Sequence, residues 1–430
     1  MRREPSGTNA PAARRTLFRG GQVFDGSRFA STDLVVADGV IVDVGPGLDG
    51  DEEIALDGLS VLPGLFDCHV HLTTSGVDYW RLAQQPFSYR FFEAVRNMRL
   101  TLGAGITFVR DAAGADLGLK RAVADGLVAG PDMRIAISMI SQTGGHADPW
   151  LPSGSCLPAL FPPHPGAPHG VADGPESVRR KAREILRAGA DMLKVAASGG
   201  VLSARDDPHH AQFRADELRE LVSEAAAADT YVMAHAHSAA GIKAAVRAGA
   251  RSIEHGVFLD DECLELMVDS GTYLVPTLSA APRLVEAAAC GAAFPDGVVA
   301  QAVEVVAAHR DAFTRALQAG VRVAMGTDSG VGPHGHNLDE LHMMSEAGMP
   351  HPAVLRSATI DAARLLGVAD VVGEIAPGKR ADLVVVANSP VDFEKLSENI
   401  VAVYQAGRLV HGDDPAGRSV RSSAISGWSE

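Results

Sequence analysis

The chain has 430 residues, enough for one large domain with a sizeable core and a smaller second domain. The net charge is −15 and the basic residues are scattered, so we expect no nucleic-acid partner. No apolar run reaches the roughly 18 residues of a membrane span, and the four cysteines form no C-x-x-C pair. These features favour a cytoplasmic protein without a membrane segment.

The two ends of the chain contain short strand patterns. Residues 1–15 are polar and lack the apolar segment of a secretory signal, so we expect a disordered tail there, and a second tail over 416–430. Residues 16–60 and 371–415 carry short alternating apolar runs broken by Gly, Asp and Pro. Such short β segments can bury their apolar faces only against each other. We therefore expect one composite β-sandwich domain built from both ends.

The middle, residues 61–370, repeats a junction of helix, glycine and strand. The glycines Gly105, Gly189, Gly249, Gly271 and Gly320 stand where a helix ends in the left-handed conformation. Candidate strands are 61–67, 106–110, 134–139, 192–196, 231–234, 252–254, 273–277 and 321–326. Alternating helices and eight parallel strands predict an α/β fold of the (β/α)8 TIM-barrel type. A doubly wound open sheet is the alternative, but no G-x-G-x-x-G follows the first strand.

Metal-binding side chains recur at the ends of these strands. They are His69 and His71, Lys194, His235, His255 and Asp328. Alternate residues of a strand share a face, so His69 and His71 can hold one ion. Imidazole and carboxylate donors suit zinc and similar divalent ions. The ammonium of Lys194 cannot ligate, but a desolvated amine can react with carbon dioxide, and the resulting carbamate can bridge two metals.

Several motifs resemble one enzyme superfamily over nearly the whole chain. The run L-P-G-L-F-D-C-H-V-H at 62–71 and the run V-G-E-I-A-P-G-K-R-A-D-L-V at 372–384 are similar to signatures of the amidohydrolase superfamily. The stretches 198–201, 234–238 and 252–256 resemble its imidazolonepropionase-like branch, which includes Xaa-Pro dipeptidases and ochratoxin-hydrolysing amidases. The resemblance implies two divalent metal ions, a carboxylated Lys194 and a homo-oligomer.

The resemblance also implies a role for each residue. His69, His71 and Asp328 would hold the more buried ion, His235 and His255 the more exposed one, and carboxylated Lys194 would bridge them. Asp328 would move a proton from the attacking water to the leaving amine of an amide. The expected substrate is a dipeptide or N-acyl amino acid. The alternatives are a cyclic amide or a carbamate- or urea-type compound, or a non-catalytic binding protein, which would be expected to have lost ligands.

Further polar residues have weaker predicted roles. His146 and His237 are expected to bind substrate, and Arg205, Arg110, Tyr89 and His237 are open candidates for a substrate carboxylate. We expect Asp111 to be a hydrogen-bonding support and Cys68 a buried structural thiol. His334 and His336 are expected near the pocket, and His164, His169, His209 and His210 in solvent. The long segment 148–175 is either a binding loop or a surface excursion.

Overall fold

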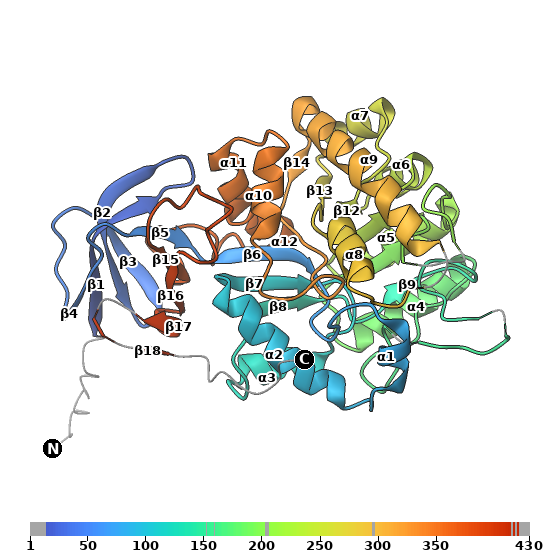
Figure 1. The fold of residues 1–430 in the computed structure, drawn as a ribbon, viewed down its shortest axis with the longest axis horizontal. Coiled ribbons are helices and arrows are strands. Elements are labelled where there is room, and N and C mark those ends of the chain that lie inside the picture. Colours follow the sequence, from blue (N-terminus) through green and yellow to red (C-terminus); the bar gives the residue numbers. More distant parts are fainter. Residues whose placement is uncertain are drawn as a thin grey trace, which may run out of the picture.

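The structure is a computed structural model, described here for residues 14–420 except 152, 159, 203–205, 295–296, 414–415 and 418. Figure 1 shows a sheet built from both chain ends beside a larger part in which helices surround parallel strands. The predicted tails over 1–15 and 416–430 lie almost entirely outside the described residues.

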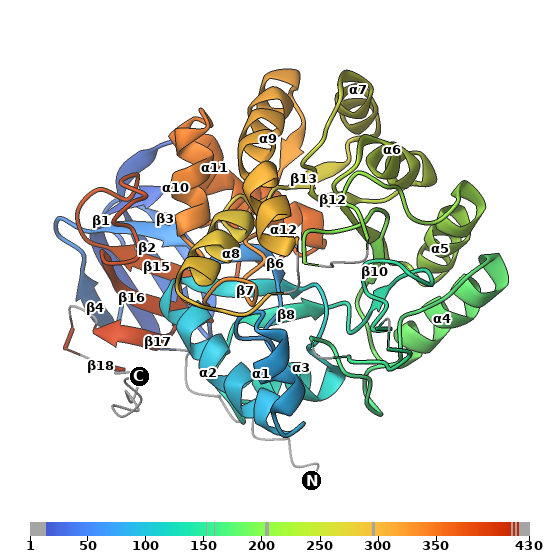
Figure 2. The same cartoon turned by 45° about the vertical axis from the view of Figure 1, so that its right-hand side comes forward.

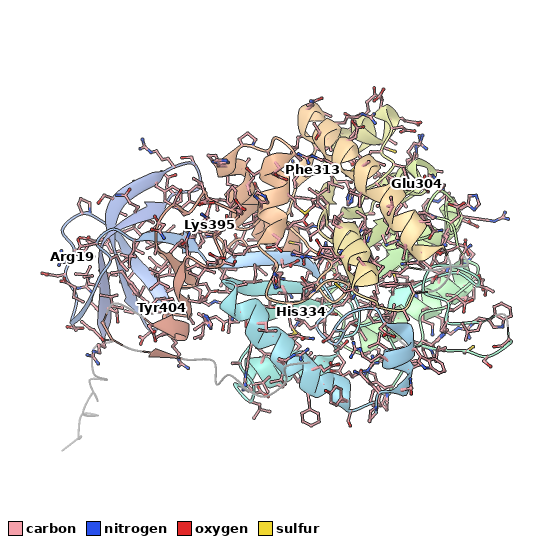
Figure 3. All side chains as sticks on the ribbon, viewed as in Figure 1. Arg19, Glu304, Phe313, His334, Lys395 and Tyr404 are labelled. Carbon is pink, nitrogen blue, oxygen red and sulfur yellow. The ribbon has the colours of Figure 1, made fainter. Side chains whose placement is uncertain are left out.

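The terminal sheet has nine strands in the order β18-β17-β16-β15-β5-β1-β2-β3, with β4 on β1. Its strands are β1 (Arg15–Phe24), β2 (Phe29–Ala37), β3 (Val40–Gly45), β4 (Glu52–Ala55), β5 (Ser60–Pro63), β15 (Leu383–Val386), β16 (Ile400–Gln405), β17 (Arg408–Asp413) and β18 (Ser419–Val420). β5 pairs with β1 on one side and β15 on the other. In its core the ring of Phe18 meets that of Tyr404 edge to face, with 5.1 Å between the ring centroids; Tyr404 is labelled in Figure 3. The two chain ends therefore share one core, as predicted.

The remaining strands form two parallel sheets, in the orders β6-β7-β8 and β14-β13-β12-β11-β10-β9. They are β6 (Leu65–Val70), β7 (Ile106–Asp111), β8 (Asp132–Ile135), β9 (Met139–Ile140), β10 (Leu193–Ala196), β11 (Val232–Ala236), β12 (Ser252–His255), β13 (Tyr273–Val275) and β14 (Arg322–Val323). Backbone hydrogen bonds connect the two sheets at both edges. Cys68 N donates to Met325 O at 2.8 Å, and Asp191 N donates to Ile135 O at 2.8 Å.

Helices follow all of these strands except β8, and they cover the outer side of the parallel strands (Figure 2). They are α1 (Tyr79–Gln84), α2 (Tyr89–Gly103), α3 (Leu117–Ala124), α4 (Pro175–Arg187), α5 (Ala215–Ala227), α6 (Ala239–Ala248), α7 (Asp261–Ser270), α8 (Ala280–Ala289), α9 (Val298–Ala319), α10 (Asp339–Glu346), α11 (His351–Ser357) and α12 (Ile360–Leu366). The five predicted left-handed glycines all have positive φ, which confirms the helix ends. Among the described helices, none has both the length and the apolar composition that crossing a membrane would require.

The predicted first strand, 61–67, is wrong as one element. Its beginning lies in β5 of the terminal sheet, and β6 starts only at Leu65. Gly64 is the point of change: its N–H donates to Asp382 O at 2.7 Å, and the chain then enters the parallel sheet. The predicted strand 134–139 is likewise divided into β8 and β9.

Replacing Gly64 by alanine should destabilise the junction between the sheets. The added Cβ would lie 2.2 Å from Thr107 Oγ1 and 2.8 Å from Asp382 Cβ, both closer than side chains pack. We expect Gly64→Ala to lower the free energy of unfolding by about 1–3 kcal/mol, measured by urea denaturation. Gly45→Ala is the matched control, because nothing lies within 4 Å of its added Cβ. Equal stability of the two variants would contradict the crowding at Gly64.

Candidate active site

All eight residues predicted for metal or substrate binding line one cavity of about 530 Å³. These are His69, His71, His146, Lys194, His235, His237, His255 and Asp328. Four of them lie within strands of the parallel sheets: His69 in β6, Lys194 in β10, His235 in β11 and His255 at the end of β12. The cavity therefore opens at the C-terminal ends of these strands, where the sequence places the site.

Three residues at this rim have a left-handed backbone that side chains seldom adopt. The φ values are 71° at His255, 55° at Thr277 and 60° at Asp328. Each such residue costs about 1–3 kcal/mol and persists only where the surrounding structure holds it. Part of that support is local, because Asp328 N donates to His69 O at 2.7 Å.

Asp328 contacts both histidines of the His-x-His motif. Its Oδ1 atom lies 3.1 Å from His71 Nε2 and 3.5 Å from His69 Nε2. Burial alone would raise the pKa of Asp328, but His69 and His71 hold that pKa well below its ordinary value. Asp328 is therefore an anion at neutral pH.

Four imidazoles pack together on the other side of the cavity. The ring of His235 lies 4.4 Å from that of His146, 4.7 Å from His237 and 4.6 Å from His255, measured between centroids. Burial is the main cause that lowers the pKa of His235 and of His255 well below 6.5. The rings of His235 and His255 are therefore neutral at pH 7, and the neutral imidazole is the form that binds metal.

The histidines are oriented by hydrogen bonds at their Nδ1 atoms. His69 Nδ1 lies 2.7 Å from Glu254 Oε2, and His71 Nδ1 lies 2.9 Å from the carbonyl oxygen of Ala113. His255 Nδ1 lies 2.7 Å from Thr277 Oγ1. Metal-binding histidines typically have such a partner on the second ring nitrogen. Donor atoms of His69, His255 and Asp328 lie within 4.8 Å of one another, as do those of His235, His237 and His255. Both groups could hold a metal ion.

Lys194 is buried at the base of the cavity. Its Nζ atom lies 3.3 Å from His69 Nε2. Burial lowers the pKa of Lys194 to about 8, so about a tenth of the amine is unprotonated at pH 7, far more than for an exposed lysine. An unprotonated amine can react with carbon dioxide.

Glu254 supports His69 from within the parallel strands, and the sequence-based prediction missed it. Arg110 Nη2 donates to both Glu254 oxygens at 2.8 and 2.9 Å, and Arg110 Nε donates to Cys68 O at 2.6 Å. Arg110 and Glu254 are both fully buried. The alternation of the polar residues Ser252 and Glu254 along β12 was the available signal.

Of the four candidates for binding a substrate carboxylate, one lines the cavity among the described residues. Arg110 cannot reach the substrate because it is buried against Glu254, so that prediction is wrong. Tyr89 is half exposed on α2 and does not line the cavity, and Arg205 lies outside the described residues. His237 remains: it lines the cavity, and its Nδ1 is buried without a hydrogen-bond partner among the described residues.

The long loop 148–175 forms one wall of the cavity. Its lining residues include Pro149, Leu151, Leu157, Leu160, Phe161 and Pro168. The Phe161 ring lies 4.9 Å from that of His71. Arg90 on α2 anchors the loop by donating to Leu160 O at 3.0 Å. The loop is therefore a part of the site and not a surface excursion.

Several other histidines differ from their predicted positions. His334, labelled in Figure 3, is buried against Thr74 O at 3.1 Å, and His336 is exposed beside Asp339, so neither borders the cavity. His169 is exposed to solvent, as predicted, although it also lines the cavity.

His164 is also not simply solvated, because its ring contacts Phe87 at 5.2 Å and Phe91 at 5.8 Å. Asp111 accepts hydrogen bonds from Leu72 N and Ala115 N, which confirms its supporting role. Cys68 is fully buried, and burial raises the pKa of its thiol, as expected for a structural cysteine.

Comparison with known proteins places the chain in one family. The model described as the amidohydrolase family matches residues 60–410. Ochratoxinase from Aspergillus niger is 34% identical over 411 residues, which cover 90% of this chain and 84% of that protein. A crystal structure of a Xaa-Pro dipeptidase with bound methionine is 35% identical, with a TM-score of 0.84 over 93% of this chain and all of that one. The crystal structure of A. niger ochratoxinase has a TM-score of 0.82 at 31% identity, and covers 96% of this chain and 99% of that one.

Removing the charge of Glu254 should destabilise the protein strongly. Glu254→Gln leaves the buried guanidinium of Arg110 without its counterion, which typically costs about 3–5 kcal/mol. Urea denaturation of the metal-free protein measures the change. Glu304→Gln is the control. Among the described residues Glu304 (labelled in Figure 3) pairs with His209 at the exposed surface, so this substitution should cost less than about 1 kcal/mol. A Glu254→Gln variant as stable as this control would contradict the role of the buried pair.

Proposed function

The chain belongs to the amidohydrolase family, and from this premise we propose that it uses divalent metal ions to hydrolyse the amide bond of a dipeptide or an N-acyl amino acid. It is a hydrolase of carbon–nitrogen bonds. We further propose that its two parallel sheets are arcs of one (β/α)8 barrel and that the terminal sheet folds over its core as a β-sandwich. Hydrogen bonds at both edges of the parallel sheets support the closed barrel.

The donor set carries the proposal. Buried neutral imidazoles and an anionic carboxylate suit zinc, which is the ion we propose. We assign His69, His71 and Asp328 to one ion, and His235 and His255 to a second. Lys194, as its carbamate, would bridge the two. The lowered pKa of Lys194 supports this modification, because only the free amine reacts.

The residues of the chain would divide the chemistry among them. Two ions, when bound, would lower the pKa of a water molecule and polarise the amide carbonyl. Asp328 would accept the proton of that water as its oxygen bonds to the carbonyl carbon. It would then deliver the proton to the leaving nitrogen as the carbon–nitrogen bond breaks. The products are a carboxylic acid and an amine.

The cavity walls indicate the kind of substrate. Apolar side chains come from two sides: Leu151, Leu157, Leu160 and Phe161 from the loop 148–175, and Ala281, Leu284 and Val305 from α8 and α9. Such a chamber suits a bulky apolar group beside the scissile amide. We propose that His146 and His237 bind the substrate carbonyl or carboxylate. A homo-oligomer and a cytoplasmic location stay predictions, as do the domain boundaries at residues 60–61 and 370–371.

A substrate panel tests this function. Zinc-loaded protein should hydrolyse N-acyl amino acids and dipeptides, and should hydrolyse those with bulky apolar acyl groups fastest. The Asp328→Asn variant should be slower by about 10²–10⁴-fold, because the proton-transferring group is lost. Liberated amine measures the reaction. Hydrolysis confined to cyclic amides, carbamates or ureas would overturn the substrate proposal, and full activity of Asp328→Asn would overturn the assigned proton transfer.

The bridge proposed for Lys194 has its own test. Lys194→Ala should bind one ion or none and should lose activity, since the shared anionic ligand is gone. Short-chain carboxylates should restore part of the activity by occupying the same space. Metal content by mass spectrometry and amine release provide the two measurements. Lys243→Ala, which removes ion pairs with Asp260 at the N-cap of α7 and with Glu262 on α7 but does not alter the cavity lining, is the control. Full metal content and activity without Lys194 would refute the bridge.

A further inference from the structure

Two buried polar residues at the start of α10 lie outside the cavity but bind the turns that shape it. Asn337 and Glu340 are both fully buried, and neither lines the cavity. Burial raises the pKa of Glu340 to about 8, so keeping a carboxylate in this position is costly. An apolar side chain of the same size would avoid that cost, which points to a task for the oxygens.

Glu340 holds the turn that follows β13. Its Oε1 accepts from Leu278 N at 2.7 Å and its Oε2 from Ser279 N at 2.9 Å. These two amides directly follow Thr277, whose backbone is left-handed. The Thr277 hydroxyl in turn lies 2.7 Å from Nδ1 of His255.

Asn337 holds the turn that carries Asp328. Its Nδ2 donates to Asp67 Oδ2 at 2.8 Å and lies 3.3 Å from Ser329 Oγ. Asp67 also accepts from Thr327 N at 3.1 Å and from His69 N at 3.0 Å. The residues on both sides of Asp328 are therefore fixed from behind.

The two turns are also joined to each other. Ser279 Oγ donates to Thr327 O at 3.3 Å. One short segment thus supports both turns, and each of them contains a residue in the left-handed region. Such strain persists only where several independent contacts enforce it.

We propose that Asn337 and Glu340 form a positioning clamp that sets Asp328 and His255 for metal binding. The inference rests on the proposed metal site. The clamp touches neither substrate nor metal; it acts through Asp67 on the Asp328 turn and through Thr277 on His255. Partners of this kind, one shell beyond the ligands, typically change metal affinity by about 10–100-fold when removed.

The Glu340→Gln variant tests the clamp. Glutamine keeps the shape but offers one oxygen where two backbone N–H groups need acceptors, so one amide is released. Met344→Ala is the matched control: Met344 lies one turn further along the buried face of α10 and loses packing but no hydrogen bond to either turn. Asn337→Leu is the second variant, in case Glu340→Gln does not fold.

Three measurements are made on each protein. They are the dissociation constant for Co²⁺, the visible absorption of the Co²⁺ complex, and hydrogen exchange of peptides 273–281 and 325–332 without metal. We expect Glu340→Gln to bind Co²⁺ about 10–100-fold more weakly, to change the absorption spectrum and to exchange faster over 273–281. Met344→Ala should lower the melting temperature at least as much and leave these three measurements near wild type.

Unchanged Co²⁺ affinity and exchange in Glu340→Gln would overturn the clamp, as would effects no larger than those of Met344→Ala. A wild-type protein that binds no Co²⁺ or Zn²⁺ would instead contradict the proposed function. In that case hydrogen exchange alone tests whether Glu340 holds the turn after β13. Unchanged exchange over 273–281 in Glu340→Gln would overturn that role.

Discussion

The contact of Asp328 with His69 and His71 is the interaction on which the rest of the site depends. It brings the end of β6 and the segment after β14 to within 3.1 Å of each other, although more than 250 residues separate them in the chain. The Asp328 carboxylate stays charged because His69 and His71 favour its anionic form. Burial penalises the charged form of the imidazoles, so most of them, such as His235, stay neutral. Neutral imidazole nitrogens and carboxylate oxygens therefore face one cavity with lone pairs that could bind a metal ion.

Behind this contact lies a layer of buried charge that does not touch the cavity. Arg110 and Glu254 form an ion pair inside the parallel strands, and Glu254 also hydrogen-bonds His69 Nδ1. Asp67 performs a comparable task for the backbone of His69 and Thr327. Because each of these groups is fully buried, a displaced partner would leave an unpaired charge or dipole, and the site geometry is thereby narrowly determined.

The front of the cavity follows a different physical rule. Its walls are apolar and come from a long loop and from α8 and α9, so they can vary in shape without disturbing the polar base. This division matches the comparisons, in which ochratoxinase and a Xaa-Pro dipeptidase share the fold although their names refer to different substrates. In the function proposed above, the polar base of the cavity would set the reaction type and its apolar walls the choice of substrate.

The sequence by itself determined which side chains meet and at which end of the strands. His69 and His71 alternate along one strand, and the other donors occupy the same place in successive helix–strand repeats, so local periodicity was sufficient. The five glycines that end helices were predictable for the same reason, since a positive φ is a local requirement.

Only the tertiary structure decided the partners of those side chains. The pairing of Arg110 with Glu254 joins residues 144 positions apart, and nothing in either neighbourhood specifies it. The sequence around Gly64 likewise predicts one continuous strand. The chain instead passes from one sheet to another at Gly64, because the preceding strand β5 pairs with β15 near the other end of the chain. Periodicity along the chain records which face a residue occupies, whereas contacts between distant segments depend on how those faces pack in space.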